Sequence, residues 1–184
     1  LVQALKRDSF WRIRLTAAEN LAGVEDEAVS ELLRYKAIYD PVNQVRIASL
    51  KALGTTGGEK NQKFILDYFT DTIKGTDLRL AALGILVDNR IPGTTGAVNS
   101  IMDKLWTKDE GRFLEFVCRD LSRSEWGELS PLFERMLGHN SWLLQIYGIR
   151  GIRRNDIAGL QGKVDALDSE GVDTRVRREV TDGK

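Results

Sequence analysis

The sequence predicts an all-α fold, an α-α superhelix in which about six helical hairpins stack into a right-handed solenoid. The 184 residues include only three prolines, and apolar residues recur at helical spacing along most of the chain. The decisive observation is an internal repeat with a period of about 33 residues, typical of units that cannot bury their apolar faces alone. The repeated position is held by Arg14, Arg46, Arg79, Arg112, Gln145 and Arg177.

One helix of each hairpin carries this repeated position. The third residue after it is small in most units, the fourth is apolar in the first five, and the seventh is usually leucine or isoleucine. These positions share one helical face, which we expect to pack inside the hairpin. Only Gly111, Glu115 and Arg119 in the fourth unit depart from the pattern. The helices of this type are expected near 9–22, 41–53, 76–88, 109–121, 141–153 and 173–181.

The other helix of each hairpin lies between these segments and shows apolar residues at i, i+3 and i+4. Residues 1–6 are interpreted as the tail of another helix of this kind. The helices of this type are expected near 26–38, 59–72, 96–106, 125–137 and 157–167.

The connectors carry residues typical of helix ends. Asp40 is expected as an N-cap, and Thr107 with Glu110 as a capping box. Gly57 and Gly58, with Gly54 before them, are interpreted as a helix stop. Each unit therefore has its own start and stop signals, as expected for a hairpin.

These residues resemble the HEAT repeat, especially the short class first noticed in phycobilisome lyases. The resemblance is carried by Asp8 with Ile13-Arg14 and Ala17-Ala18 through Leu21, and by Asp40 with Val45-Arg46 and Ser49-Leu50 through Leu53-Gly54. It covers nearly the whole chain and implies a single HEAT-like repeat domain over residues 1–184. It does not select a function, because HEAT solenoids serve as scaffolds, adaptors, lyase subunits and DNA glycosylases.

The repeated arginines are predicted to be structural. The apolar positions three, four and seven residues later lie on the same side of the helix, so the arginine stem points into the hairpin interface. A buried guanidinium needs a partner, and Asp8 and Asp40 stand six residues before Arg14 and Arg46. We expect a ladder of charge-assisted bonds between neighbouring units, continued by Arg79, and no catalytic role for these arginines.

The opposite face of the same helices is the predicted protein-binding surface. Positions two before, and two, five and nine after, the repeated residue lie opposite the core on a helical wheel. The HEAT resemblance implies that these helices line the concave side of the solenoid. Their mixed charge and partly apolar character suits a protein partner, although an ordinary solvated face is the alternative. The candidates are Arg12, Glu19, Gln44, Lys51, Leu114, Val117, Tyr147, Arg150 and Arg154.

Composition excludes several classes of function. Twenty-seven basic residues balance 27 acidic ones, so we do not expect nucleic-acid binding through many phosphate contacts. With one histidine and one cysteine, we expect no metal site, no cofactor and no catalytic residue in this chain. His139 is interpreted as a turn residue and Cys118 as a packing residue.

The chain shows neither a signal peptide nor an apolar segment that could span a membrane, which favours the cytoplasm. It begins at Leu1 without a methionine, inside an expected helix. We therefore expect a fragment of a larger protein, with no membrane partner.

Two classes of function remain after these exclusions. The first is a non-catalytic scaffold that contacts a protein partner or an upstream domain of the same polypeptide. Within it, the segment from Asp8 to Arg14, followed by Ala17-Ala18 and the Asp40 unit, resembles the start of the C-terminal helical-repeat region in bacterial relatives of the aminopeptidase N family of zinc peptidases. The peptidase zinc motif needs two histidines, so its activity is not carried over.

The second class is an enzyme of HEAT architecture. Ser9-Phe10-Trp11-Arg12-Ile13-Arg14 resembles a tryptophan-arginine segment of alkylpurine DNA glycosylases. A phycobilin lyase-like subunit is a further alternative within this class. Against a glycosylase stands the lack of a basic excess that could form a DNA groove.

Overall fold

The computed structural model describes residues 1–107 and 112–182. Within them the chain forms twelve α-helices and two short 3-10 helices, with no strand, so the predicted all-α fold is confirmed. None of the described helices combines the length and the apolar character needed to cross a membrane. Glu110, the second residue of the expected capping box, and Gly111 lie outside the described residues.

The helices group into two compact units, residues 1–94 and residues 95–184. Each unit has its own packed interior and is described by itself below. The single repeat domain expected over the whole chain stays a prediction.

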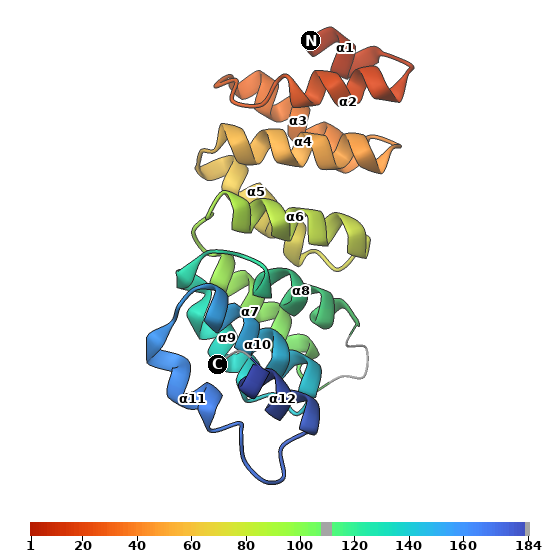
Figure 1. The fold of residues 1–184 in the computed structure, drawn as a ribbon. Helices are drawn as coiled ribbons and strands as arrows, with labels where there is room; N and C mark the ends of the chain where they lie inside the picture. Colours follow the sequence, from red (N-terminus) through yellow and green to blue (C-terminus); the bar gives the residue numbers. More distant parts are fainter. Residues whose placement is uncertain (108–111, 183–184) are drawn as a thin grey trace. The chain divides into compact units, whose positions relative to one another are not determined.

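Unit 1 consists of two helical layers. Helices α2, α4 and α6 pack side by side in one layer, while α3 packs on α4, and α5 on α6, from the other (Figure 1). The hairpin interpretation of this part of the sequence is therefore confirmed. The helices are α1 (Val2–Arg7), α2 (Trp11–Glu19), α3 (Glu27–Tyr39), α4 (Asn43–Thr56), α5 (Glu59–Thr70) and α6 (Thr76–Asp88).

The core of unit 1 follows the repeat. The residues four and seven after each repeated arginine are buried, as Leu50 and Leu53 show in α4. The residue before the repeated arginine is buried at Val45 and Leu78, but its counterpart Ile13 in α2 is 45% exposed. The same sequence position is thus buried only where a preceding unit covers it.

Some caps and stop residues of the unit 1 helices agree with the sequence prediction, and others do not. Gly57 and Gly58 follow α4 with positive φ angles of 70° and 81°, which glycine adopts without strain, and so they end the helix as predicted, whereas Gly54 lies inside α4 and is not part of the stop. Asp26 caps α3, its carboxylate accepting from the backbone amides of Ala28 and Val29. The prediction of Asp40 as an N-cap is wrong, because α4 begins two residues after its expected start and Asp40 instead ends α3.

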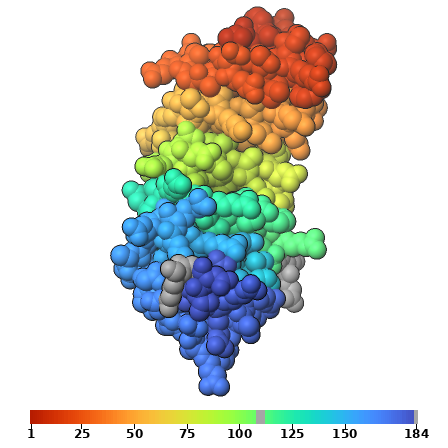
Figure 2. All heavy atoms as spheres, viewed as in Figure 1, coloured from red at the N-terminus to blue at the C-terminus, as the bar shows by residue number. Residues whose placement is uncertain are grey.

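Unit 2 repeats the same two-layer arrangement less regularly. Helices α8, α10 and α12 share one layer, and α9 packs against α10 from the other (Figure 1). The connector between α11 and α12 projects from the body of this unit (Figure 2). The helices are α7 (Thr94–Leu105), α8 (Arg112–Ser122), η1 (Gly127–Leu129), α9 (Ser130–Leu137), α10 (Trp142–Arg154), η2 (Ala158–Leu160), α11 (Gln161–Asp165) and α12 (Thr174–Asp182).

Two glycines allow α9 and α10 to approach closely. A Cβ added at Gly148 would lie 2.9 Å from the carbonyl oxygen of Phe133, and one added at Gly151 would lie 2.4 Å from the Phe133 ring. Real Cβ atoms do not approach other atoms this closely, so these glycines are required by the packing rather than by backbone conformation. They fix the position of α10 and of the side chains on its other faces.

The fourth repeat, which contains α8, departs from the predicted register. Leu114 and Val117, predicted on the binding surface, are only 2% and 0% exposed, so this prediction is wrong for both. The buried residues Val117, Cys118 and Leu121 stand three, four and seven positions after Leu114, which is the spacing found after the repeated residue elsewhere. The repeated position in α8 is therefore Leu114, two residues later than Arg112.

Candidate functional site

The predicted arginine ladder contains a bidentate ion pair between two neighbouring repeats of unit 1. Arg14 of α2 donates from Nε and Nη2 to the two carboxylate oxygens of Asp40, at 2.8 and 2.9 Å. Both side chains are buried, and Lys36 adds a longer contact of 3.3 Å to the same carboxylate. A bidentate pair of this kind is directional as well as strong, so it fixes α2 relative to the start of α4.

The ionisation of Asp40 reflects these contacts. Burial opposes the charged form, but the hydrogen bonds from Arg14, and the backbone amide of Val42, more than offset burial and lower the pKa of Asp40 below its usual value. Asp40 is therefore charged at neutral pH although it is buried. The pair is architectural, since no cleft adjoins it among the described hollows.

The other members of the ladder donate to backbone carbonyls. Arg14 also donates to the carbonyl oxygen of Asp8, and Arg46 donates to that of Asp40, six residues earlier in both cases. Arg79 donates to the carbonyl oxygen of Phe69. The repeated arginines of unit 1 thus tie their own helix to the backbone that precedes it, and Arg14 adds the bidentate pair with Asp40.

The predicted binding face of unit 1 is exposed. Arg12, Glu19, Gln44 and Lys51 all lie at the surface, as expected from the helical wheel. A hollow of about 570 Å³ runs between α4 and α6. Its wall includes the residues five and nine after the repeated arginine, and its lining is Ile47, Lys51, Thr55, Ala81, Gly84, Ile85, Asp88 and Asn89.

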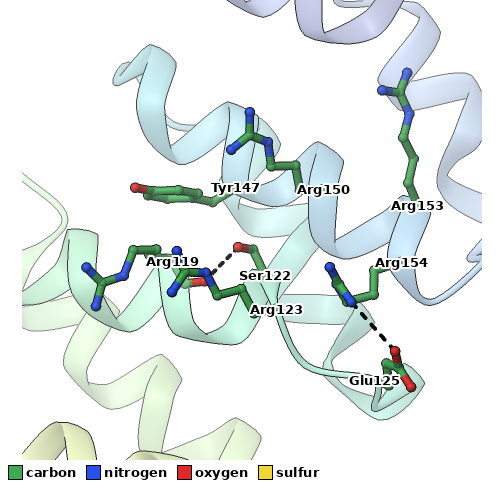
Figure 3. Close-up of a pocket in the computed structure, with 8 residues that line it drawn as sticks. All are labelled: Arg119, Ser122, Arg123, Glu125, Tyr147, Arg150, Arg153 and Arg154. Atoms are coloured by element: carbon green, nitrogen blue, oxygen red, sulfur yellow. Dashed lines mark hydrogen bonds and ion pairs between the residues drawn. The ribbon is translucent and has the colours of Figure 1, made fainter. Parts of the chain in front are cut away.

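A second hollow, of about 660 Å³, lies in unit 2 between α8 and α10. We call it the arginine hollow, because five of its eight lining residues are arginines. Its lining is Arg119, Ser122, Arg123, Glu125, Tyr147, Arg150, Arg153 and Arg154. In Figure 3, Arg119 and Ser122 come from α8 and Arg123 from the turn directly after it, while Tyr147 and the other three arginines come from α10.

The same sequence pattern recurs on both sides of the arginine hollow. Tyr147, Arg150 and Arg154 stand two, five and nine residues after Gln145 in α10. Counted from Leu114, the same positions are Phe116, Arg119 and Arg123. Each set consists of an aromatic residue followed by two arginines; Tyr147 lines the hollow, whereas Phe116 only contacts Arg119, whose guanidinium lies 5.0 Å from the centre of the Phe116 ring.

The arginines of α10 are held by α12. Arg150 donates from Nε and Nη2 to the carboxylate of Glu179, at 3.0 and 2.8 Å, and this contact raises its pKa. Arg153 points toward α12, where its guanidinium donates to the carbonyl oxygens of Glu179 and Val180 (Figure 3). These bonds limit the movement of both side chains, so this wall of the hollow is organised before any ligand arrives.

The remaining arginines are held more loosely. Arg119 pairs with the adjacent Asp120 at 2.9 Å. Arg154 lies 3.6 Å from Glu125, beyond hydrogen-bond distance, and the Glu125 side chain is 79% exposed. The guanidinium of Arg123 makes no hydrogen bond or ion pair within the described residues. The hollow therefore has donors that a ligand can engage.

Part of this site could be predicted from the repeat pattern, and part of it could not. The pattern placed Tyr147, Arg150 and Arg154 on one exposed face, and the structure brings these three together in the arginine hollow. It missed Arg119 and Arg123, because the fourth repeat was counted from Arg112. The signal that could have found them is the leucine-valine-leucine spacing at 114, 117 and 121, which marks the true register of α8.

His139 has a structural role. Its Nδ1 accepts from the backbone amide of Ser141 at 2.9 Å, so Nε2 carries the proton and donates to the carbonyl oxygen of Trp106. The Trp106 ring meets the imidazole edge-on, with ring centres 4.5 Å apart. Both nitrogens are thus engaged in joining two connectors of unit 2, as the interpretation of a turn residue implied.

Cys118 is fully buried in α8, in agreement with the packing role inferred from the sequence. Burial, with a smaller contribution from Glu115, raises the pKa of its thiol to about 12. The thiol is therefore protonated and shielded at neutral pH. Within the described residues no three side chains of histidine, cysteine, aspartate or glutamate are grouped to hold a metal ion.

The stacked helical hairpins define a helical-repeat protein. The family model of HEAT repeats matches residues 1–86, which is the part of unit 1 from α1 into α6. That match and the all-helical structure support a HEAT-repeat helical fold. No curated protein matches the chain.

Proposed function

We propose that this chain is a non-catalytic scaffold that binds a protein partner, or an upstream domain of its own polypeptide. The contact is made by the helices that carry the repeated position, which are the second helices of the hairpins and form the second-helix layer of each unit. HEAT repeats generally mediate contacts between proteins. The observation that carries the proposal is that the same helical positions line a hollow in each unit, first with Lys51 and Asp88 and then with Tyr147 and Arg150. A repeated slot with changing chemistry is suited to recognising a partner surface rather than to a reaction.

Site-specific crosslinking tests this function. A photo-crosslinking amino acid is introduced in place of Lys51 or Tyr147 in the full-length protein. We expect both positions to crosslink to a partner or to an upstream domain. The matched control is Lys63, which is exposed on α5 in the other layer of unit 1. Crosslinks from position 63 alone would mean that the partner binds the first-helix layer, and the proposal would fail.

A finer proposal concerns the parent protein. We propose that the chain is the C-terminal helical-repeat domain of a zinc aminopeptidase relative, on the strength of the resemblance in the segment from Asp8 to Arg14. Such a domain would pack on the catalytic domain or limit access to its cleft. The test is the coding sequence upstream of Leu1, which should contain two histidines and a glutamate on one helix. An upstream region without that motif contradicts this finer proposal and leaves the scaffold function intact.

The glycosylase alternative receives no support from the site. Trp11 and Arg12, which carry that resemblance, belong to unit 1, whereas the arginine hollow is lined only by residues of unit 2. Arg12 lies against the Trp11 ring at 5.4 Å, on the exposed side of α2. A base-excision assay on alkylated DNA would separate the two functions, and we expect no excision.

A further inference from the structure

The arginine hollow concentrates positive charge, although the chain as a whole has no net charge. The whole sequence balances 27 basic against 27 acidic residues, yet five arginines line this one hollow. Three carboxylates contact them, those of Asp120, Glu125 and Glu179, so two positive charges remain uncompensated. A wall with an excess of positive charge attracts ligands of opposite charge.

We propose that the arginine hollow binds an acidic peptide segment of a protein partner, in which several glutamates or aspartates pair with the guanidinium groups. The proposal rests on the proposed scaffold function and names the chemistry of its partner. Arg123 and Arg154 supply the first contacts, because the former has no intramolecular pair and the latter has only a long one.

The shape of the donors favours carboxylates. A guanidinium donates two parallel N–H bonds, which match the two oxygens of a carboxylate. Arg150 and Arg153 are already fixed by bonds to α12, so they present their remaining donors in a set geometry. Binding would therefore cost little further ordering of these side chains.

The composition of the wall favours a peptide over a nucleic acid. Tyr147 offers an aromatic ring and a hydroxyl group to the apolar parts of a peptide. Asp120, Glu125 and Glu179 interrupt the positive surface and would repel a continuous phosphate backbone, whereas a peptide can place neutral residues opposite them. The hollow, at about 660 Å³, also fits a few side chains rather than a duplex.

Fluorescence anisotropy with the full chain tests the proposal. The probe is a fluorescein-labelled peptide of about eight residues, roughly 25 Å when extended, in which glutamate alternates with serine. The comparison peptide has glutamine at each glutamate. We expect the glutamate peptide alone to bind, and binding to weaken as the ionic strength rises from about 0.02 to 0.15 M, because exposed charge pairs are screened by salt.

Two charge reversals locate the site. Arg123→Glu should weaken binding of the glutamate peptide at least about tenfold, because a like charge is placed where a carboxylate must dock. Its guanidinium makes no bond within the described chain, so the fold should be retained, which a thermal unfolding curve checks. The control Arg178→Glu changes the same charge on exposed α12, outside the hollow, and should alter affinity less than about twofold.

Several results would overturn the proposal. Equal binding of the glutamate and glutamine peptides, or equal weakening by Arg123→Glu and Arg178→Glu, would show that the hollow does not recognise carboxylates. Tighter binding of a single-stranded oligonucleotide, with the same loss in Arg123→Glu, would assign the site to nucleic acid. If the peptide fails to bind while position 147 still crosslinks to a partner, the scaffold function stands and only the acidic chemistry of the partner is wrong.

Discussion

The contact between Arg14 and Asp40 determines how individual residues contribute to stability. Both side chains are buried and the pair is bidentate, whereas Arg46 is half-buried and donates to a backbone carbonyl. Removing one member of a buried pair leaves the other charge without compensation, which costs more than losing a single exposed hydrogen bond. The two arginines, equivalent in the repeat, should therefore differ in their effect on folding.

We predict that Arg14→Ala lowers the free energy of unfolding by about 3–5 kcal/mol. Arg46→Ala should lower it by about 1–2 kcal/mol. Chemical denaturation followed by circular dichroism measures both. A larger loss in Arg46→Ala would mean that the main ionic link in unit 1 is not the one between α2 and Asp40.

The same pair predicts how stability depends on pH. The pKa of Asp40 is lower in the folded chain than in the unfolded chain, so ionised Asp40 stabilises the fold above about pH 4, the ordinary aspartate value. This contribution is lost as the pH falls through the folded pKa. Urea denaturation between about pH 2 and 6 should show an acid-sensitive stability in the wild type that is reduced in Asp40→Asn. Parallel curves for the two proteins would contradict this assignment.

At the scale of elements, glycine decides how closely helices pack. Gly151 faces the Phe133 ring in unit 2, while Gly84 lies in α6 with no atom near an added Cβ. Alanine at the first position must push α9 and α10 apart, but at the second it only restricts the unfolded chain. The same substitution should thus have opposite signs at the two positions.

We predict that Gly151→Ala destabilises the chain by about 1–3 kcal/mol. Gly84→Ala should stabilise it by roughly 0.5–1 kcal/mol, since glycine in the interior of a helix is unfavourable. Thermal and urea unfolding of the two variants measure the difference. Stabilisation by Gly151→Ala would show that α9 and α10 are not in close contact at Phe133.

Most helices could be predicted from the sequence because burial imposes a helical period that local residues report directly. The α6 prediction of 76–88 agrees with Thr76–Asp88. The α9 prediction began too early, at 125, because a 3-10 helix precedes Ser130 and Pro131 stands in the first turn of α9. Such a change of helix type depends on packing rather than on period.

The candidate site was predicted only in part, for a reason visible in α8. A fixed period assumes that every connector has the same length, so a displacement of two residues moved Leu114 and Val117 from the core to the predicted surface. The same error hid Arg119 and Arg123. The contacts that organise the hollow, such as Arg150 with Glu179, join residues 29 positions apart and leave no local pattern.

At the scale of the whole molecule, the helices of residues 1–94 form a unit with its own core. Helix α3 packs on α4 and α4 on α6, and each of these helices buries leucines, as neighbouring repeats do in other helical-repeat proteins. The HEAT-repeat match also ends within it, at residue 86. Unit 1 should therefore be able to fold without the rest of the chain.

We predict that a fragment of residues 1–94 is helical and unfolds cooperatively in urea. Its circular dichroism spectrum should have the minima of an α-helix, and its unfolding curve should be sigmoidal. The control is the same fragment with Leu50→Ala, which removes a fully buried side chain and should lower the midpoint. A fragment without cooperative unfolding would mean that its core needs further repeats.

Because Cys118 is buried, the reaction rate of its thiol reports local opening of the fold. Cys118 is the one cysteine in the sequence, and a protonated, shielded thiol reacts with an alkylating reagent only while α8 is transiently open. Labelling of this sulfur, followed by mass spectrometry, would therefore measure the rate of transient opening in unit 2 without an engineered probe. The labelling rate should fall when the acidic peptide occupies the arginine hollow, since α8 supplies both the thiol and Arg119, and a ligand that holds one residue of a helix slows the opening of the whole helix.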